Sequence, residues 1–339
     1  MIRRRLGRGL RLGAAAAALA APLAGCVTVH GERENIPSLS PAEAARVLTH
    51  FAQVDTEAAR TYDESYVAQI EAGPLGEIDT AQVKAAHTQH PEGNAAADPL
   101  KLSDTRYLIP RQVGWPKFFV ADTATNRSTT ARWVLLFRRG SAAEPWRADY
   151  LAVVPDGAMP ALATDQGGHV LPVPADQPGL LVRPDALSSA YAGYLQSGSR
   201  AADFAPGPST TQLRADRAAK ARTPDSVTQY ADQADTAGDF APAALRTKDG
   251  GALVFFATRH QSRSTYRAGF NLSVDASTRA LMTGTPKTAV TLARVGQQLA
   301  TVPLAPGGKD AGSGGGSGGP SARVDFLSRR TGLVSAKGE

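Results

Sequence analysis

The chain has 339 residues, a formal net charge of +6 and a single cysteine. This length allows two domains of ordinary size. A single cysteine excludes a fold that is held together by disulfides within the chain.

The N-terminal segment has the features of a secretory signal. Five arginines fall within the first 11 positions, and an uncharged apolar run follows at residues 12–24. A positive segment before a short apolar segment is typical of such signals. The run is shorter than the roughly 20 apolar residues that a membrane-spanning helix needs. The sequence therefore predicts export, and it leaves both the general secretory route and the twin-arginine route open.

The apolar run ends in Leu23-Ala24-Gly25-Cys26. This stretch resembles the lipobox of bacterial lipoproteins, and the resemblance implies cleavage before Cys26 and a diacylglyceryl thioether on its sulfur. The alternative is a buried or free thiol. Two acyl chains are sufficient for stable anchoring. We therefore expect a lipoprotein on the outer face of the cell membrane, with the membrane as a partner through the lipid on Cys26.

Cleavage before Cys26 changes the charge balance. It removes five of the 37 basic residues and none of the 31 acidic ones, so that 32 basic residues remain and the net charge is +1. This balance gives no reason to expect nucleic-acid binding.

A proline-dense stretch divides the remaining chain. Residues 155–184 contain six prolines and four glycines, a density that interrupts helices and central strands. The predicted organisation is a lipidated tether at 26–39, a first α+β domain at 40–154, a linker at 155–184 and a second α+β domain at 185–339. Residues 307–320 are rich in glycine and predict a flexible loop within the second domain.

The first unit begins with helix signals and continues with strand signals. Ser40, Pro41 and Glu43 combine a capping box with a proline at the first helical position. A second, shorter helix is expected from Asp79 to Pro91. Strands are expected at residues 106–109, 117–121, 132–138 and 146–154, with a hairpin loop at 139–145.

The second unit repeats this order. Helices are expected from Asp185 onward and at residues 213–221. Strands are expected at residues 252–259, 265–269, 279–282, 288–295, 298–304 and 323–327.

The repeated order predicts an α+β fold of two tandem units, each with helices on one face of an antiparallel sheet. The order of elements resembles the cystatin-like and nuclear-transport-factor-like folds. A resemblance of this kind carries no function with it.

Three scattered stretches point to a family. They are residues 25–32, residues 114–122 and residues 332–336. They resemble an uncharacterised family of lipoproteins from high-GC Gram-positive bacteria. The resemblance implies the location of the protein and no activity.

Few residues suggest catalysis or metal binding. His87, His90 and Glu92 form the best metal-like cluster, but their spacing differs from the His-Glu-x-x-His of zinc proteases. No Gly-x-Ser-x-Gly motif is present. The carboxylates of Asp63, Glu64 and residues 235–239 are interpreted as surface charge. We therefore predict no catalytic residue, no metal and no cofactor.

Aromatic residues crowd into one region, residues 107–150, which contains all three tryptophans. A sheet core is the favoured interpretation. Tryptophan and tyrosine also line ligand pockets, and the second half offers counterparts in Phe255, Phe256 and Tyr266. The candidate pocket residues are Trp115, Phe119, Trp133, Trp146 and Tyr150.

These observations favour a non-catalytic role, in which the protein binds a small apolar ligand or a cell-envelope protein. One alternative is an extracytoplasmic enzyme whose site is assembled from separated residues. A second alternative is a structural protein of the envelope. A pocket with convergent ionisable groups would favour the enzyme.

The lipid anchor gives a first testable prediction. Replacing Cys26 by serine removes the sulfur that the lipid requires, so the variant should take up no labelled fatty acid and should leave the membrane fraction. The measurement is metabolic labelling followed by fractionation of cells. A variant that still takes up label would contradict the assignment.

Overall fold

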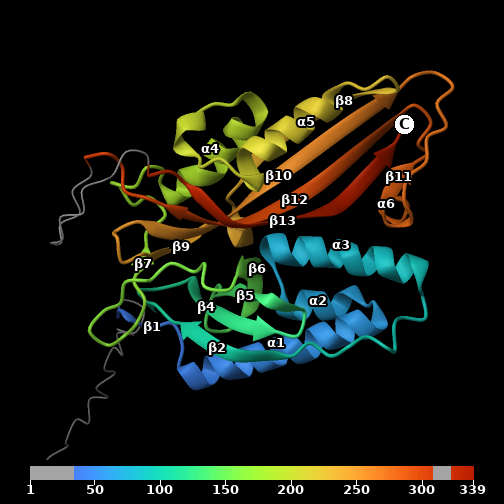
Figure 1. The fold of residues 1–339 in the computed structure, drawn as a ribbon. Helices are drawn as coiled ribbons and strands as arrows, with labels where there is room; N and C mark the ends of the chain where they lie inside the picture. The colour runs from blue at the N-terminus through green and yellow to red at the C-terminus, as the bar shows by residue number, and fades with distance from the viewer. Residues whose placement is uncertain (1–33, 308–321) are drawn as a thin grey trace, which may run out of the picture.

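Two sheets lie face to face between two sets of helices, as Figure 1 shows. The computed structural model describes residues 34–307 and 322–339. Cys26, most of the tether and nearly all of the glycine-rich segment lie outside the described residues. The predicted mixture of helices and mostly antiparallel sheet is confirmed.

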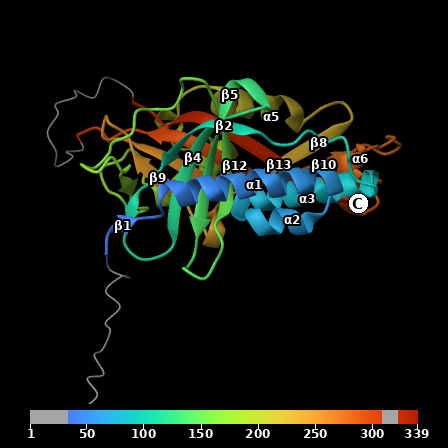
Figure 2. The same ribbon diagram turned by 90° about the horizontal axis from the view of Figure 1, so that it is seen from below.

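Helices α1 (Pro41–Thr61) and α2 (Glu64–Ile70) lie on one side of the molecule, and α3 (Gly73–Gln89) lies closer to the second sheet (Figure 1 and Figure 2). The predicted cap is present, because Ser40 accepts a hydrogen bond from the N–H of Glu43 at 3.1 Å. The helix expected from Asp79 begins earlier, at Gly73, and α2 was not predicted. No helix in residues 34–307 or 322–339 is long and apolar enough to cross a bilayer.

The first sheet has the order β2-β4-β5-β6. Its strands are β2 (Leu102–Leu108), β4 (Lys117–Thr125), β5 (Ser128–Arg139) and β6 (Arg147–Pro155). The strands and the hairpin expected in this region are confirmed. A separate short pair joins β1 (Ile36–Pro37) to β3 (Arg111–Gln112).

The second sheet has the order β11-β13-β12-β10-β9-β7, and β8 also pairs with β10. Helices α4 (Pro184–Ser197) and α5 (Leu213–Ala221) belong to its outer side (Figure 1). The strands are β7 (Pro172–Val173), β8 (Ser226–Asp235), β9 (Ala243–Arg246), β10 (Ala252–Tyr266), β11 (Met282–Gly284), β12 (Ala289–Val302) and β13 (Asp325–Gly338).

Several expectations for the second half need correction. The strand expected at 279–282 is partly helix α6 (Ala276–Ala280), because Asp275 caps a helix by accepting the N–H of Thr278 at 2.8 Å. Strand β12 is continuous where two strands were expected. Of the strand expected at 265–269, only the first two residues belong to the end of β10, and residues 267–269 are not strand. Strands β8 and β9 were not predicted.

The two sheets share a core. Val120, Leu136 and Tyr150 of the first sheet pack against Leu253, Phe255 and Leu299 of the second. Edge strand β6 is also bound by side chains from the second sheet, because the N–H of Leu151 donates to Gln297 Oε1 at 2.8 Å and the N–H of Val153 donates to Ser328 Oγ at 3.1 Å.

The proline-dense segment also contributes to the cores. Val170, Val173, Leu180 and Val182 are buried, and residues 172–173 form β7. The segment is therefore packed over both units. The division of the chain into two domains stays a prediction.

The shared core leads to a prediction about the first unit alone. In the segment from Leu39 to Pro155, the side chains of Phe118, Val120 and Leu136 would lose their cover and face water. We expect this fragment to bind a hydrophobic dye and to aggregate, whereas the full chain unfolds in one cooperative transition. Dye fluorescence and thermal unfolding measure both. A monomeric fragment with cooperative unfolding would instead support independent domains.

Candidate functional site

The five aromatic pocket candidates do not line one cavity. Phe119 and Trp146 belong to the core under α1, with their rings edge to face at 5.2 Å, and Trp133 packs against the same core. Tyr150 points to the opposite face of the sheet, where its hydroxyl donates to the carbonyl of Phe240 at 2.8 Å. Trp115 is 38% exposed. The structure therefore favours the sheet-core interpretation.

The aromatic counterparts in the second half are also dispersed. Phe255 lies between the sheets, and Phe256 lies on the outer side of the second sheet. Tyr266 stacks on Phe270 with ring centroids 4.9 Å apart.

A cavity of about 200 Å³ lies among α1, the junction of α2 with α3, strands β5 and β6, and β13. Its polar lining consists of Asp55, Glu71, Asp79, Gln82 and Arg330. Its remaining walls are Phe51, Ala58, Ala59, Val67, Ile70, Val83, Trp133 and Leu151. We name this space the acid cavity, because three carboxyl groups face a single guanidinium group.

Local structure places each carboxyl group. Asp55 lies one helical turn after buried Phe51, and Asp79 lies one turn before Val83, so both are on inward faces of their helices. Glu71 ends α2, and its backbone forms a bridge to Ala148 in β6. Glu71 is therefore held against the edge of the first sheet.

Arg330 reaches the acid cavity from the second sheet. It lies on β13 opposite Gln297, whose side chain binds the edge of β6. Its Nη1 atom is buried and has no hydrogen-bond partner among the described residues. Two residues further on, Gly332 lies so close to Ile78 of α3 that an added Cβ would be 2.4 Å from Ile78 Cγ2. This close contact holds α3 against β13 beside the cavity.

Burial governs the titration of the three carboxyl groups. It raises the pKa of Glu71 well above its usual range, and the nearby carboxyl groups of Asp79 and Asp55 raise it further. Burial also raises the pKa of Asp55 and of Asp79 to about 6, against the opposing charges of Arg127 and Arg330 respectively. Glu71 is 4% exposed, and its Oε2 atom has no hydrogen-bond partner in the part of the chain that the structure describes.

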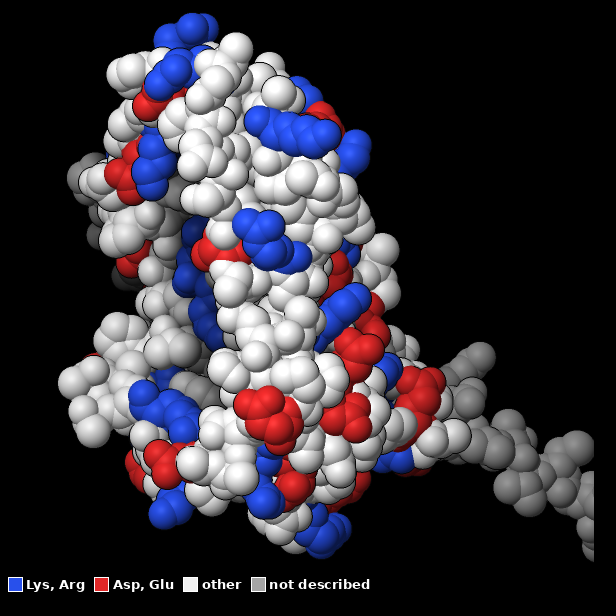
Figure 3. All heavy atoms as spheres, turned by 90° about the vertical axis from the view of Figure 1, so that its right-hand side faces the viewer, with Lys and Arg blue, Asp and Glu red and all other residues white. Residues whose placement is uncertain are grey.

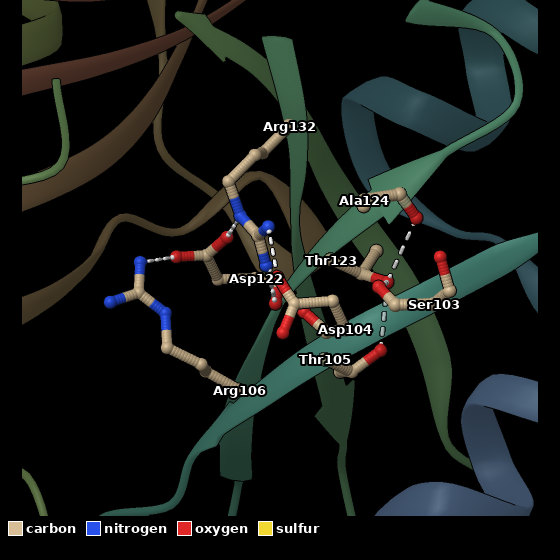
Figure 4. A network of polar contacts seen from close by, with 8 residues as sticks. All are labelled: Ser103, Asp104, Thr105, Arg106, Asp122, Thr123, Ala124 and Arg132. Atoms are coloured by element: carbon tan, nitrogen blue, oxygen red, sulfur yellow. Dashed lines mark hydrogen bonds and ion pairs between the residues drawn. The ribbon is translucent and has the colours of Figure 1, made fainter. Parts of the chain in front are cut away.

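A second polar cluster, on the first sheet, has no such unpaired groups. Figure 4 shows Asp122 between Arg106 and Arg132, with Arg132 also bound to Asp104. Asp122 is fully buried, and both of its carboxylate oxygens accept hydrogen bonds. The hydroxyl groups of Thr105 and Thr123 also bind each other, at 2.7 Å. This cluster fastens β2 to β4 where their register is irregular, and we assign it a structural role.

The metal-like cluster lies at the surface. His90 Nδ1 is 3.5 Å from Glu92 Oε1, and both side chains are more than half exposed, at 61% and 73%. Over the described ranges, no group of three His, Cys, Asp or Glu side chains is arranged to hold a metal ion.

The residues of the acid cavity were missed in the sequence. One signal was available: Asp55 is a carboxylate at an inward position of the helix that begins at Pro41. Glu71 and Arg330 gave no local signal, since only the packing of β13 against α3 brings them together.

The raised pKa values give a prediction about stability. A carboxyl group whose pKa is higher in the folded state than in the unfolded state loses its proton more easily when the chain unfolds. The free energy of unfolding therefore falls as pH rises from the unfolded pKa, about 4, to the folded pKa, about 6. Replacing Asp79 by asparagine should therefore raise the free energy of unfolding at pH 7.5 by about 1–2 kcal/mol and leave it nearly unchanged at pH 4. Urea unfolding at both pH values measures this difference. The control is the replacement of the exposed residue Asp98 by asparagine. An Asp79 variant that is less stable than the original chain at pH 7.5 would contradict the prediction.

Comparison with known proteins identifies the family. The family described as "Domain of unknown function (DUF8094)" matches residues 35–338. An uncharacterized lipoprotein of Streptomyces avermitilis is 43% identical over 337 residues, which cover 99% of this chain and 97% of the relative. One uncharacterized lipoprotein of Streptomyces coelicolor is 41% identical over 99% of this chain and 97% of the relative. A second one from the same organism is 27% identical over 79% of this chain and 78% of the relative. No solved structure matches. The resemblance inferred from the sequence is confirmed, and the chain belongs to the DUF8094 family.

Proposed function

We propose that this protein is a lipid-anchored, extracytoplasmic binding protein that holds a small polar ligand in the acid cavity. One observation carries the proposal: Glu71 and Arg330 line the same cavity, and each has a buried polar atom, Oε2 and Nη1 respectively, without a hydrogen-bond partner among the described residues. An unsatisfied buried polar atom costs about 1–3 kcal/mol. A ligand that binds both atoms would offset this cost.

The anchor part of the proposal rests on the lipobox-like stretch that ends at Cys26 and on relatives that are named lipoproteins. A diacylglyceryl group on Cys26 holds the protein on the outer face of the cell membrane. Residues 26–39 serve as the tether, and only its last residues are among those described.

The charges of the acid cavity define the ligand. Three carboxyl groups accept hydrogen bonds from an amine, and the guanidinium of Arg330 donates to a carboxylate or a similar oxygen group. The volume of about 200 Å³ is below the 300–1,000 Å³ typical of drug-sized sites. The ligand is therefore a small zwitterion of the amino-acid type. Its positive charge would stabilise the ionised carboxyl groups, so binding would release protons.

An enzyme is the second candidate function. The pKa values of Asp55 and Asp79, raised by burial to about 6, lie near the range in which a carboxyl group works as a general acid or base. Under this alternative, one carboxyl group moves a proton on the bound molecule. Turnover of the ligand, followed by NMR, separates this candidate from simple binding.

We also propose that the two halves are related units of the cystatin-like or nuclear-transport-factor-like type. In each half, helices precede a mostly antiparallel sheet and cover one of its faces. The acid cavity lies between the helices and the sheet of the first unit, and a strand of the second unit closes it.

Binding of three simple probes tests the proposed ligand class. β-Alanine carries both an amine and a carboxylate, whereas ethylamine and propionate carry one each. We expect β-alanine to bind the purified full chain saturably at pH 7.5, and its affinity to fall at least about tenfold at pH 5, where Asp55 and Asp79 become protonated. Ethylamine and propionate should bind more weakly. Isothermal titration measures all three.

Variants locate the binding in the acid cavity. Arg330→Gln and Glu71→Gln each remove one ionisable partner of the ligand, and each should weaken the binding of β-alanine at least about tenfold. Glu57→Gln is the matched control, because Glu57 lies on α1 with its side chain 44% exposed and pairs with Arg60 at the surface. Equal affinity in all variants, or no saturable binding of any probe, would refute the proposed site.

A further inference from the structure

A second cavity lies on the opposite side of the seven-stranded sheet. It is a cleft of about 310 Å³ between α5 and strands β8, β10, β12 and β13. On the side of the molecule seen in Figure 3, Lys and Arg side chains lie along the floor of a groove. We propose that this cleft, which we name the basic cleft, binds a phosphoryl group.

Four cationic side chains line the basic cleft. Arg217 and Lys220 come from α5, Arg294 from β12 and Arg329 from β13. Asp216 is the single carboxylate among the described residues of the lining, and its Oδ1 atom accepts a hydrogen bond from Gln212 at 2.7 Å. The lining therefore carries a clear excess of positive charge.

One wall of the basic cleft is rigidly positioned. Both Nη atoms of Arg217 donate to the two carboxylate oxygens of Asp232, at 2.7 and 2.9 Å. His260 Nδ1 lies 2.6 Å from Asp232 Oδ1, and its Nε2 lies 2.9 Å from the hydroxyl of Thr258. The side chain of Asp232 is fully buried. This carboxylate is therefore occupied by its own partners and does not neutralise the rest of the cleft.

The titration of this wall agrees with its contacts. Burial alone would raise the pKa of Asp232, but hydrogen bonds from His260 and Arg217 outweigh it and lower the pKa. Burial lowers the pKa of His260. Asp232 is therefore ionised and His260 neutral at pH 7, and Arg217 is the cation that balances Asp232.

Within residues 34–307 and 322–339, neither Arg294 nor Arg329 forms an ion pair, although the guanidinium of Arg329 hydrogen-bonds to the hydroxyl of Tyr191. Arg294 Nη1 donates a long hydrogen bond of 3.5 Å to the hydroxyl of Ser262. Burial lowers the pKa of Arg294, and this effect outweighs the opposing influence of Tyr230 and Asp275, while the charge of Arg217 lowers the pKa further. The Nε atom of Arg329 is buried, and no described residue accepts a hydrogen bond from it. Partly desolvated cations are costly unless an anion pairs with them.

The donor set matches the phosphoryl group. Guanidinium groups bind phosphate oxygens through pairs of parallel hydrogen bonds, and the Lys220 ammonium adds a point charge. The hydroxyl groups of Ser262 and Thr331 also line the cleft and supply neutral donors. A volume of about 310 Å³ accommodates a phosphoryl group with a small organic substituent. A soluble phosphate ester and a phospholipid headgroup share this chemistry.

Titration of the full chain with inorganic phosphate and with glycerol phosphate, in neutral detergent at low salt, tests the proposal. Both should bind saturably, and more tightly than chloride. Arg294→Gln and Arg329→Gln should each raise the Kd at least about tenfold. Arg294→Lys keeps the positive charge but loses the paired N–H donors of the guanidinium group, so it should raise the Kd by an intermediate amount. Circular dichroism confirms that each variant is folded.

The control is Arg222→Gln, because Arg222 is an exposed residue at the end of α5 that does not line the cleft. It should change the Kd less than about twofold. An equal loss in the control would mean that only net charge attracts phosphate, and this result, or the absence of saturable binding, would overturn the proposal. The Arg330→Gln variant should bind phosphate normally, so this test and that of the acid cavity can fail independently.

Vesicles of phosphatidylglycerol distinguish the two sources of the phosphoryl group. If they compete with glycerol phosphate and phosphatidylcholine vesicles do not, the site binds an anionic lipid headgroup. If neither competes, the site binds a soluble phosphoryl compound. Competition that persists in the Arg294→Gln variant would place vesicle binding elsewhere and would count against the headgroup assignment.

Discussion

Burial of the four-stranded sheet on both faces is the constraint on which the rest of the structure depends. On one face, Phe119 and Phe137 stack and meet Phe51 of α1. On the other, Tyr150 packs against Phe255 of the second sheet. A sheet that is covered on both faces leaves little of its own surface free, so a cavity that reaches this sheet lies beside the layers that cover it. The acid cavity is such a place, between α1, α3 and β13.

Local signals explain which elements could be predicted. Helix α1 begins where the cap at Ser40 indicates, and α5 has the expected bounds. Strand β8 was not predicted because the sequence of Ser226–Asp235 is largely polar, and it lies at an edge of the sheet, where β10 is its neighbouring strand. Helix α2 was missed because it is only seven residues long, and its cap, Asp63, had been interpreted as surface charge.

The packing of the two sheets is reflected in the pattern of apolar residues along the strands. The apolar runs at 118–121, 134–137 and 252–257 are continuous rather than alternating. Such runs are typical of strands that are buried on both faces, and they favour a layered arrangement over two separate units. The candidate sites could not be predicted in this way, because Glu71 and Arg330 meet only when β13 lies against the helices of the first unit.

The two cavities are linked by consecutive residues of one strand. Side chains alternate between the faces of a sheet, so Arg329 lines the basic cleft and Arg330 lines the acid cavity. If the pairing of β13 with β12 shifted by one residue, the side chains of β13 would turn to the opposite faces of the sheet, and each arginine would leave its cavity. The pairing of β12 with β13 is irregular at two places, between Ala293 and Arg294 and between Leu299 and Ala300. These irregularities bracket a regular stretch that contains both arginines. Because such irregularities redirect side chains, we infer that they set the register that gives each cavity its own guanidinium group.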